Sequence, residues 1–337
     1  MTQIIPFISV LIPTFNEEKR ISVCLESIFN LKYPHDMFEV IIIDGFSKDR
    51  TVEFAEKYPV RILYEKKPTR AAGCNVGVLA AKGEIIAFTD ADCTVDSLWL
   101  NKLIENYDNP LVGGVGGPNI VMPENDLATK IFSLMKIPLA FGGFRYTTTY
   151  HEKREIYHNP GCNSSIRKDV YCKVGMMDEK LLTAEDTELS ERIRNEGFKL
   201  LYAPDAKIFH HWKFDIKRYF NWMKRYGMGQ AQFIIKSKFK FGKESRSPLF
   251  LIPSIGIIVL STFILLGFLN SYFWFICLFL IIIYAIYLII CGIKAERNIF
   301  RIDQILKSSI VLIIGQIAWG IGVIISLIKN FNVRGNL

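Results

Sequence analysis

Two stretches without charged residues, both in the last third of the chain, constrain most strongly what it can fold into. Ser247 to Ile293 contains no Lys, Arg, Asp or Glu, and Ser308 to Ile328 is a second such stretch, with Gln316 as its one amide. About 20 apolar residues cross a bilayer, so the first stretch is long enough for two spans and the second for one more. We therefore expect a membrane domain over residues 247–330, with transmembrane helices at 249–269, 272–293 and 308–328.

The segment before these stretches is basic and aromatic. Lys217 to Arg246 holds nine basic residues against one acid, Glu244, and Trp, Tyr and Phe side chains are interleaved with them. This pattern is typical of a segment that lies in the membrane interface, and basic flanks stay on the cytosolic side. Residues 1–6 lack the basic start and long apolar core of a signal peptide. We expect a cytosolic domain over residues 1–215, an interfacial segment over 216–246, and a multi-pass protein of the plasma membrane.

The net charge of +8 is concentrated beside the expected spans. Anionic lipid head groups are the nearer partner for charge in that place, so we expect membrane lipids as partners and no nucleic acid. The seven cysteines show no paired metal-ligand spacing, and the chain is expected to face a reducing compartment or the membrane, so they should be free thiols.

Short apolar runs alternate with helical patterns in the first third of the chain. The runs are 7–12, 38–43, 60–63 and 85–88, and the helical patterns lie near 17–30, 49–57, 70–81 and 97–107. This alternation predicts an α/β fold, with a mostly parallel sheet covered by helices on both faces. Ligands of such sheets bind outside the carboxyl ends of the strands.

Polar side chains follow three of these strands. Pro13-Thr14-Phe15-Asn16-Glu17 ends the first, Asp44-Gly45-Phe46-Ser47 the second, and Asp90-Ala91-Asp92 the fourth. Two carboxylates one residue apart repel each other unless a cation or several hydrogen bonds compensate them. Helix capping explains acids such as Asp49 and Asp96, but it does not explain three clusters on one edge. No G-x-G-x-x-G follows the first strand, which argues against a dinucleotide site.

Four motifs occur in an order and spacing that resemble family 2 glycosyltransferases of the GT-A fold. They are SVLIPTFNEEKRI, VIIIDGFSKDRT, TRAAGCNVGVLAAKGEIIAFTDADC, and the later NPGCNSSIR with LLTAEDTELSERI. The resemblance covers about residues 7–230. Within the family the chain is most similar to membrane-anchored enzymes that build exopolysaccharides, including the succinoglycan type, or lipid-linked glycans.

The resemblance implies a nucleotide-sugar donor, usually uridine-linked, and a divalent metal, Mg²⁺ or Mn²⁺. By motif position, Asp92 would be the direct metal ligand, and Asp90 would hold the ribose or assist the metal. His210 or His211, placed after the last strand of the domain, would complete the metal shell, with a purely structural hydrogen bond as the alternative. The implied donor contacts are Pro13, Thr14, Asn16 and Glu17 at the base and ribose, Asp44 at the uracil N–H, and Arg70 and Asn75 at the diphosphate or sugar.

The same resemblance implies a general base and an inverting reaction. Asp186, in the E-D motif, is the candidate for the carboxylate that takes the proton of the acceptor hydroxyl, and Glu185 is the fallback. A second interpretation of the motif is a capping box, in which Asp186 reaches back to Thr183 at the start of a helix.

The expected reaction is the transfer of one sugar to a lipid-linked or glycan acceptor at the cytosolic membrane face. A processive polysaccharide synthase is an alternative, although the Q-x-x-R-W motif of processive members is absent from the sequence. An inactive nucleotide-sugar-binding scaffold is another. A sugar nucleotidyltransferase would carry a Gly-rich first loop, whereas PTFNEE has no glycine. A transporter would need charged groups within its spans.

Overall fold

The chain forms two compact units in the computed structural model, which describes residues 5–67, 69–137, 140–141, 150–237, 251–296 and 301–334. The first unit comprises Met1–Met122 with Thr147–Trp212, and the second comprises Pro123–Tyr146 with Lys213–Leu337. The segment 123–146 therefore belongs to the second unit although it interrupts the first in sequence. The boundaries expected at residues 215 and 246 stay predictions.

The first unit is built on a sheet with the strand order β3-β2-β1-β4-β9-β6-β10-β8. Four neighbouring pairs run parallel, and β9 runs antiparallel to both of its neighbours, β4 and β6. The strands are β1 (Ile8–Thr14), β2 (Phe38–Asp44), β3 (Arg61–Tyr64), β4 (Ile85–Phe88), β6 (Val112–Gly116), β8 (Arg154–Glu155), β9 (Ser164–Arg167) and β10 (Lys199–Tyr202). The predicted α/β class is confirmed, and the four predicted early strands lie at one end of this order.

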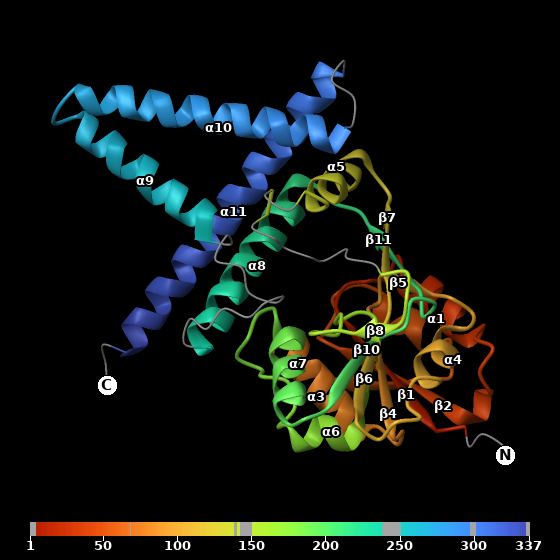
Figure 1. The fold of residues 1–337 in the computed structure, drawn as a ribbon. Helices are drawn as coiled ribbons and strands as arrows, with labels where there is room; N and C mark the ends of the chain where they lie inside the picture. The colour runs from red at the N-terminus through yellow and green to blue at the C-terminus, as the bar shows by residue number, and fades with distance from the viewer. Residues whose placement is uncertain are drawn as a thin grey trace. The chain divides into compact units, whose positions relative to one another are not determined.

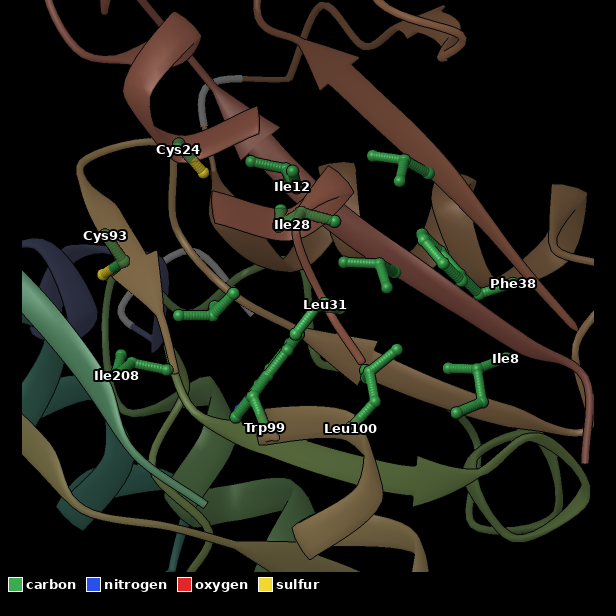
Figure 2. Packing of buried hydrophobic residues seen from close by; sticks show 14 of the residues in the cluster. Ile8, Ile12, Cys24, Ile28, Leu31, Phe38, Cys93, Trp99, Leu100 and Ile208 are labelled. Atoms are coloured by element: carbon green, nitrogen blue, oxygen red, sulfur yellow. The ribbon is translucent and has the colours of Figure 1, made fainter. Parts of the chain in front are cut away.

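Helices cover both faces of this sheet, as Figure 1 shows. The helices α1 (Ile21–Phe29), α2 (Thr51–Ala55) and α4 (Trp99–Ile104) pack on one face, and α3 (Arg70–Ala80), α6 (Lys168–Lys173) and α7 (Glu185–Asn195) on the other. A short 3₁₀ helix, His35–Met37, precedes β2. Figure 2 shows one of the two cores, in which Ile8 and Ile12 of β1 point toward the α1 and α4 side with Ile28 and Trp99.

Alternation along the strands explains the two cores. Val10 and Ile12 belong to the α1 and α4 core, whereas Leu11 between them belongs to the core under α3. Successive side chains of a strand point to opposite faces, so a run such as ISVLIPT, apolar at nearly every position, is suited to a strand covered on both sides.

A second, three-stranded sheet has the order β5-β11-β7. Its strands are β5 (Cys93–Val95), β11 (Ile208–Trp212) and β7 (Asn119–Pro123). β5 directly follows the Asp90-Ala91-Asp92 sequence and pairs antiparallel with β11, so that His210 lies opposite Cys93. The sequence reading placed His210 and His211 after the last strand, and this was wrong, because both lie within β11.

The second unit contains five described helices. They are α5 (Asp126–Met135), α8 (Ile216–Lys236), α9 (Ile252–Gly267), α10 (Tyr272–Glu296) and α11 (Ile302–Arg334). Of these, α10 and α11 are long and apolar enough to cross a membrane. The first predicted span is shorter than expected among the described residues, because α9 has 16 residues, or about 24 Å of helix, against a hydrocarbon core of about 30 Å. Residues 238–250, and with them the end of the predicted interfacial segment, lie outside the described residues.

Close backbone contacts join α8 to α11 within the second unit. A Cβ added to Gly227 would lie 2.3 Å from the carbonyl oxygen of Trp319, and one added to Gly322 would lie 2.1 Å from that of Lys224. The Tyr219 hydroxyl donates to the Val311 carbonyl at 3.1 Å. Small residues allow this approach, as they do between membrane helices. α8 therefore packs closely on α11, and the interfacial location predicted for 216–246 stays a prediction.

We predict that Gly117→Ala destabilises the first unit, because the new Cβ would lie 2.0 Å from the Ala206 carbonyl oxygen. Overpacking of this kind costs about 1–3 kcal/mol. The matched control is Gly73→Ala in α3, whose Cβ would lie in ordinary contact, 3.5 Å from Ile43. Chemical denaturation followed by fluorescence should show a loss for Gly117→Ala only, and equal behaviour of the two variants would contradict the predicted clash.

Candidate active site

Arg70 supplies the positive charge beside the first acid of the Asp90-Ala91-Asp92 sequence. Its Nε lies 3.2 Å from Asp90 Oδ1, its Nη2 donates to the Gly161 carbonyl, and its Nη1 is 3.6 Å from Glu185 Oε1. Arg70 is the first residue of α3, and the Thr69 hydroxyl caps that helix by accepting the Ala72 N–H. The cap fixes where the helix begins and therefore where the guanidinium is placed.

His210 lies beside the second acid. Its Nε2 is 3.0 Å from Asp92 Oδ1. Burial disfavours a charged imidazole, but the Asp92 carboxylate raises the pKa of His210 well above its ordinary value. His211 points elsewhere, since neighbouring side chains on a strand face opposite ways, and its Nε2 lies 3.1 Å from the Thr94 hydroxyl. Of the two histidines, His210 is thus the one that the structure brings to Asp92.

Two buried cysteines adjoin this pair. Ligand atoms of Asp92, Cys93 and His210 all lie within 4.8 Å of one another. A hydrogen bond with Cys93 lowers the pKa of the Cys162 thiol to about 7, while burial raises the pKa of Cys93. All seven cysteines are free thiols, as predicted. The Asp92 carboxylate, the Cys93 thiol and the His210 imidazole form one cluster with the spacing of metal-ion ligands.

The acids of the E-D motif lie on the other side of Arg70. Asp186 accepts the Gly161 N–H at its Oδ2, at 3.0 Å, and the Thr187 N–H at its Oδ1, at 2.7 Å. Glu185 is buried, whereas Asp186 is partly exposed. Gly161 therefore connects the two acidic motifs, because its carbonyl binds Arg70 while its N–H binds Asp186.

The capping box proposed for this helix start is wrong. The N-cap of α7 is Ala184, with φ of 66° and ψ of 17°, and it makes no side-chain cap hydrogen bond. Among the described residues, the Thr183 hydroxyl has no hydrogen-bond partner. A left-handed alanine is strained, and such strain is found at functional sites. The turn directs Asp186 toward Gly161 instead of back along its own chain.

Hydrogen bonds join the loops after β1 and β2, which carry the predicted base and ribose contacts. The Asn16 N–H donates to the Ser47 hydroxyl and Asn16 Oδ1 accepts the Lys48 N–H. The Glu17 N–H donates to the Thr51 hydroxyl. Pro13 and Thr14 are the last two residues of β1, and the Thr14 hydroxyl donates to the Ile12 carbonyl. These residues lie at the edge that the sequence predicted.

Two predicted contacts are more enclosed than the sequence suggested. Asp44 is only 1% exposed, and its carboxylate accepts the N–H and hydroxyl of Ser47. Asn75 is buried, and its amide bonds to Tyr171, Met177 and Glu179. The structure therefore does not bring the Asn75 side chain to the Arg70 cluster, and its donor role stays a prediction.

Asn163 has a structural importance that sequence reasoning missed. Its Oδ1 accepts the Trp99 indole N–H at 2.8 Å, and its Nδ2 donates to the carbonyls of Pro118 and Ala206. The signal was present, since Asn163 lies in the NPGCNSSIR motif, but no role was assigned to it. The amide supports the loop that carries Gly161 and Cys162.

The site as a whole gathers acids, an arginine and a histidine at the carboxyl edge of a sheet with helices on both faces. Such an edge suits a ligand that combines anionic groups with a metal ion. The fold and site thus define an α/β protein with a charged candidate ligand site at its strand ends.

The chain is similar to known glycosyltransferases over most of its length. Residues 9–175 match the family model described as Glycosyl transferase family 2. The probable glycosyltransferase YdaM of Bacillus subtilis (strain 168) is 30% identical over 260 residues, 72% of this chain and 59% of that protein, so the chain spans less than two thirds of that relative. A Methanococcus voltae enzyme, dolichyl N-acetyl-alpha-D-glucosaminyl phosphate 3-beta-D-2,3-diacetamido-2,3-dideoxy-beta-D-glucuronosyltransferase, is 27% identical over 246 residues, 69% of this chain and 75% of its own length.

Among solved structures, the mannosyltransferase PcManGT from Pyrobaculum calidifontis, in complex with GDP-Man and Mn²⁺, has a TM-score of 0.53 at 22% identity, covering 73% of this chain and 67% of its own. This likeness shows a shared fold. The chain belongs to glycosyltransferase family 2, and it has the GT-A fold. The predicted family and fold are confirmed.

We predict that Arg70→Met destabilises the first unit, because Asp90 and Glu185 would lose the cation between them. Removing one partner of a largely buried ion pair costs about 3 kcal/mol. Arg50→Met is the matched control, since Arg50 pairs with Glu53 on an exposed helix surface. Exposed pairs contribute little, so this variant should keep the wild-type stability. Equal denaturation midpoints for the two variants would contradict the role given to Arg70.

Proposed function

We propose that the protein transfers one sugar from a uridine diphosphate sugar to a lipid-linked or glycan acceptor at the cytosolic face of the plasma membrane. The observation that carries the proposal is the convergence of Asp90, Asp92 and Asp186 around Arg70 and His210. An inactive scaffold would not need this combination of a charged donor edge and a partly exposed carboxylate. The Methanococcus relative, whose name specifies a dolichyl-linked acceptor, supports the lipid-linked class.

The donor set at Asp92 fits a divalent ion. Carboxylate and imidazole ligands suit Mn²⁺, and a carboxylate suits Mg²⁺, whereas the neighbouring Cys93 thiol is a softer ligand than either ion prefers. Asp92 and His210 would hold the ion, with Asp90 assisting it or binding the ribose. When bound, the ion would act as a Lewis acid that stabilises charge on the departing diphosphate. Mn²⁺ in the PcManGT structure supports this assignment.

Arg70 would bind the donor diphosphate from the other side. Its Nη1 is a buried donor atom without a hydrogen bond among the described residues, although Glu185 lies 3.6 Å away. A buried donor of this kind is costly unless a ligand satisfies it. A diphosphate oxygen is a fitting partner, because arginine binds such groups strongly. Asn16 and Glu17, with Pro13 and Thr14, would border the ribose.

Asp186 would be the general base of an inverting reaction. The N–H groups of Gly161 and Thr187 fix the direction of its carboxylate. An ionised carboxylate has about four lone-pair positions, so these bonds leave room for an acceptor hydroxyl. Loss of its proton to Asp186 would make the acceptor oxygen a better nucleophile as it attacks the anomeric carbon. Glu185, buried against Arg70, is less suited to this role.

The second unit would anchor the protein at the membrane surface, where the acceptor lies. Its helices α10 and α11 can each span a bilayer by length and composition, and α8 exposes basic residues such as Lys217, Arg218 and Arg225. Anionic head groups attract such residues on the cytosolic side. The experiment that tests the whole proposal offers a panel of nucleotide sugars to the intact protein in lipid, with a cell lipid extract as acceptor. Failure to transfer any sugar would overturn it.

We predict that donor binding requires a divalent metal and Asp92. EDTA should abolish the calorimetric signal of UDP-sugar binding. Loss of an outer-shell partner of a metal weakens metal binding by roughly tenfold to hundredfold. Because Asp92 would be a direct ligand, Asp92→Asn should weaken donor binding at ordinary metal concentrations by more than that.

Two further variants form a matched pair for this measurement. His210→Ala should weaken metal-dependent binding, while His211→Ala should not, because only His210 lies beside Asp92. Unchanged donor affinity in EDTA would rule out the metal bridge.

We predict that Asp186→Asn lowers the transfer rate by roughly a hundredfold to ten-thousandfold, the usual contribution of a positioned base. Donor affinity and the thermal midpoint should barely change, since an asparagine oxygen can still accept the Gly161 N–H. Transfer rate, affinity and midpoint are measured on one preparation, with Glu185→Gln beside it. If Asp186→Asn retains most of its turnover, Asp186 is not the general base and Glu185 becomes the candidate.

A further inference from the structure

The helix α7 binds the loop 159–161 at two points. The Asp186 carboxylate accepts the Gly161 N–H at 3.0 Å, and the Ser190 hydroxyl accepts the Asn159 N–H at 3.1 Å. Asp186 and Ser190 are four residues apart, so they lie one turn apart on the same face of the helix. Ser190 and Asn159 are each only 2% exposed. The carboxylate proposed as general base therefore shares its helix face with a buried serine that binds the same loop.

The amino-terminal turn of α7 is not held by a side-chain cap. Its N-cap, Ala184, has a left-handed φ of 66° and makes no side-chain cap hydrogen bond. A cap normally fixes where a helix begins and where its first side chains are placed. In α7 the side chains of Asp186 and Ser190 bind the loop 159–161 instead. Two contacts one turn apart fix the direction of the helix against the loop, whereas a single contact would let it pivot.

Pro160 connects the two contact points stiffly. Its ring fixes its own φ at about −65° and restricts the conformation of the residue before it, Asn159. The Pro160 carbonyl accepts the Asn163 N–H at 3.3 Å, and the Asn163 carbonyl accepts the Gly117 N–H at 3.1 Å. A shift of Asn159 is therefore passed on to the N–H of Gly161.

The strand β6 lies close against the same loop. A Cβ added to Gly114 would lie 2.6 Å from Asn159 Nδ2, and one added to Gly116 would lie 2.7 Å from Pro160 Cδ. Both distances are too short for a Cβ, so the loop rests on the bare backbone of the two glycines. The sheet thus blocks one direction of movement, and the hydrogen bond to Ser190 opposes another.

The contact with the loop also explains why a serine occupies this position. Alanine has the higher helix propensity, and a buried hydroxyl is costly unless it is hydrogen-bonded. The backbone N–H of Asn159 is buried as well and needs an acceptor. Ser190 satisfies both groups with one hydrogen bond.

We propose that Ser190 is a positioning residue for sugar transfer. By holding Asn159, it keeps the Gly161 N–H in the place that directs the Asp186 carboxylate toward the acceptor hydroxyl. The inference rests on the proposed function, because it requires Asp186 to act as the general base. A misplacement of about 1 Å can cost roughly a hundredfold in rate.

The donor side of the site depends less on this contact. Arg70 binds the Gly161 carbonyl, but it also has Asp90 and Glu185 as partners. A shift of the loop therefore leaves two of the contacts of Arg70 in place. Loss of the Ser190 hydroxyl should slow transfer without weakening the binding of the nucleotide.

The test compares Ser190→Ala with Ser9→Ala in the full-length protein in lipid. Ser9 is the matched control, because its buried hydroxyl also accepts a backbone N–H, that of Gly83 at 2.9 Å, but near the amino end of β1. The transfer rate is measured with the nucleotide sugar that wild type uses and a cell lipid extract as acceptor. Affinity for UDP is measured by calorimetry with Mn²⁺, and stability as the thermal midpoint.

Ser190→Ala should transfer sugar roughly tenfold to hundredfold more slowly than wild type, with unchanged affinity for UDP. Ser9→Ala should keep the wild-type rate. Both variants should lower the thermal midpoint by similar amounts, because each leaves a buried backbone N–H without its acceptor.

The double variant of Ser190→Ala with Asp186→Asn separates positioning from a structural role. It should transfer as slowly as Asp186→Asn alone, because no carboxylate is left to misplace. A further loss of rate in the double variant overturns the inference, and so does a wild-type rate for Ser190→Ala. Loss of UDP affinity, or failure of Ser190→Ala to fold, also overturns it, since Ser190 would then be a structural residue. If wild type transfers no sugar, the proposed function itself fails and the inference fails with it.

Discussion

The site depends on the compensation of two carboxylates, Asp90 and Asp92, that lie one residue apart after β4. Asp90 pairs with Arg70, and Asp92 pairs with His210. The two cations come from elements far apart in sequence, the start of α3 and the strand β11. The acids are therefore stable only when the large sheet, α3 and the small sheet are all in place, and this couples the formation of the site to the completion of the fold.

Arg70 extends this coupling to the acids of α7. Its guanidinium reaches Asp90, Glu185 and the Gly161 carbonyl, and Gly161 in turn holds Asp186. The proposed donor-binding and proton-accepting groups thus share one glycine loop and one arginine. A substitution at Arg70 would disturb both halves of the proposed reaction, whereas one at Asp186 would disturb only the second. Transfer kinetics of Asp186 variants are therefore easier to interpret than those of Arg70 variants.

Local patterns predicted the early strands and helices, because an apolar run bounded by polar turns depends only on residues that are neighbours in the sequence. They also predicted the short strand β9 within residues 159–167, but they did not predict β6. The sequence of β6, VGGVG, is rich in glycine, a residue that is depleted in strands. A Cβ at Gly113 would collide with Phe198, and a Cβ at Gly114 would collide with Asn159. Contacts between distant segments require those glycines. The capping box failed for the same reason, since TAED does not reveal the left-handed Ala184. Hydrogen-bond partners across the fold decide such positions.

In the second unit, hydropathy likewise does not predict which helix is buried by the rest of the protein. Both α10 and α11 are strongly apolar. In the most apolar stretch of α10, 22% of the residues are buried inside the protein, against 56% in that of α11. The difference arises because α8 packs on α11 through Gly227 and Gly322. Composition alone treats the two helices alike, although α10 exposes most of its side chains. An apolar residue on α10 is therefore more often exposed on the protein surface, and one on α11 more often meets protein, so the same polar substitution should disturb the two helices through different interactions.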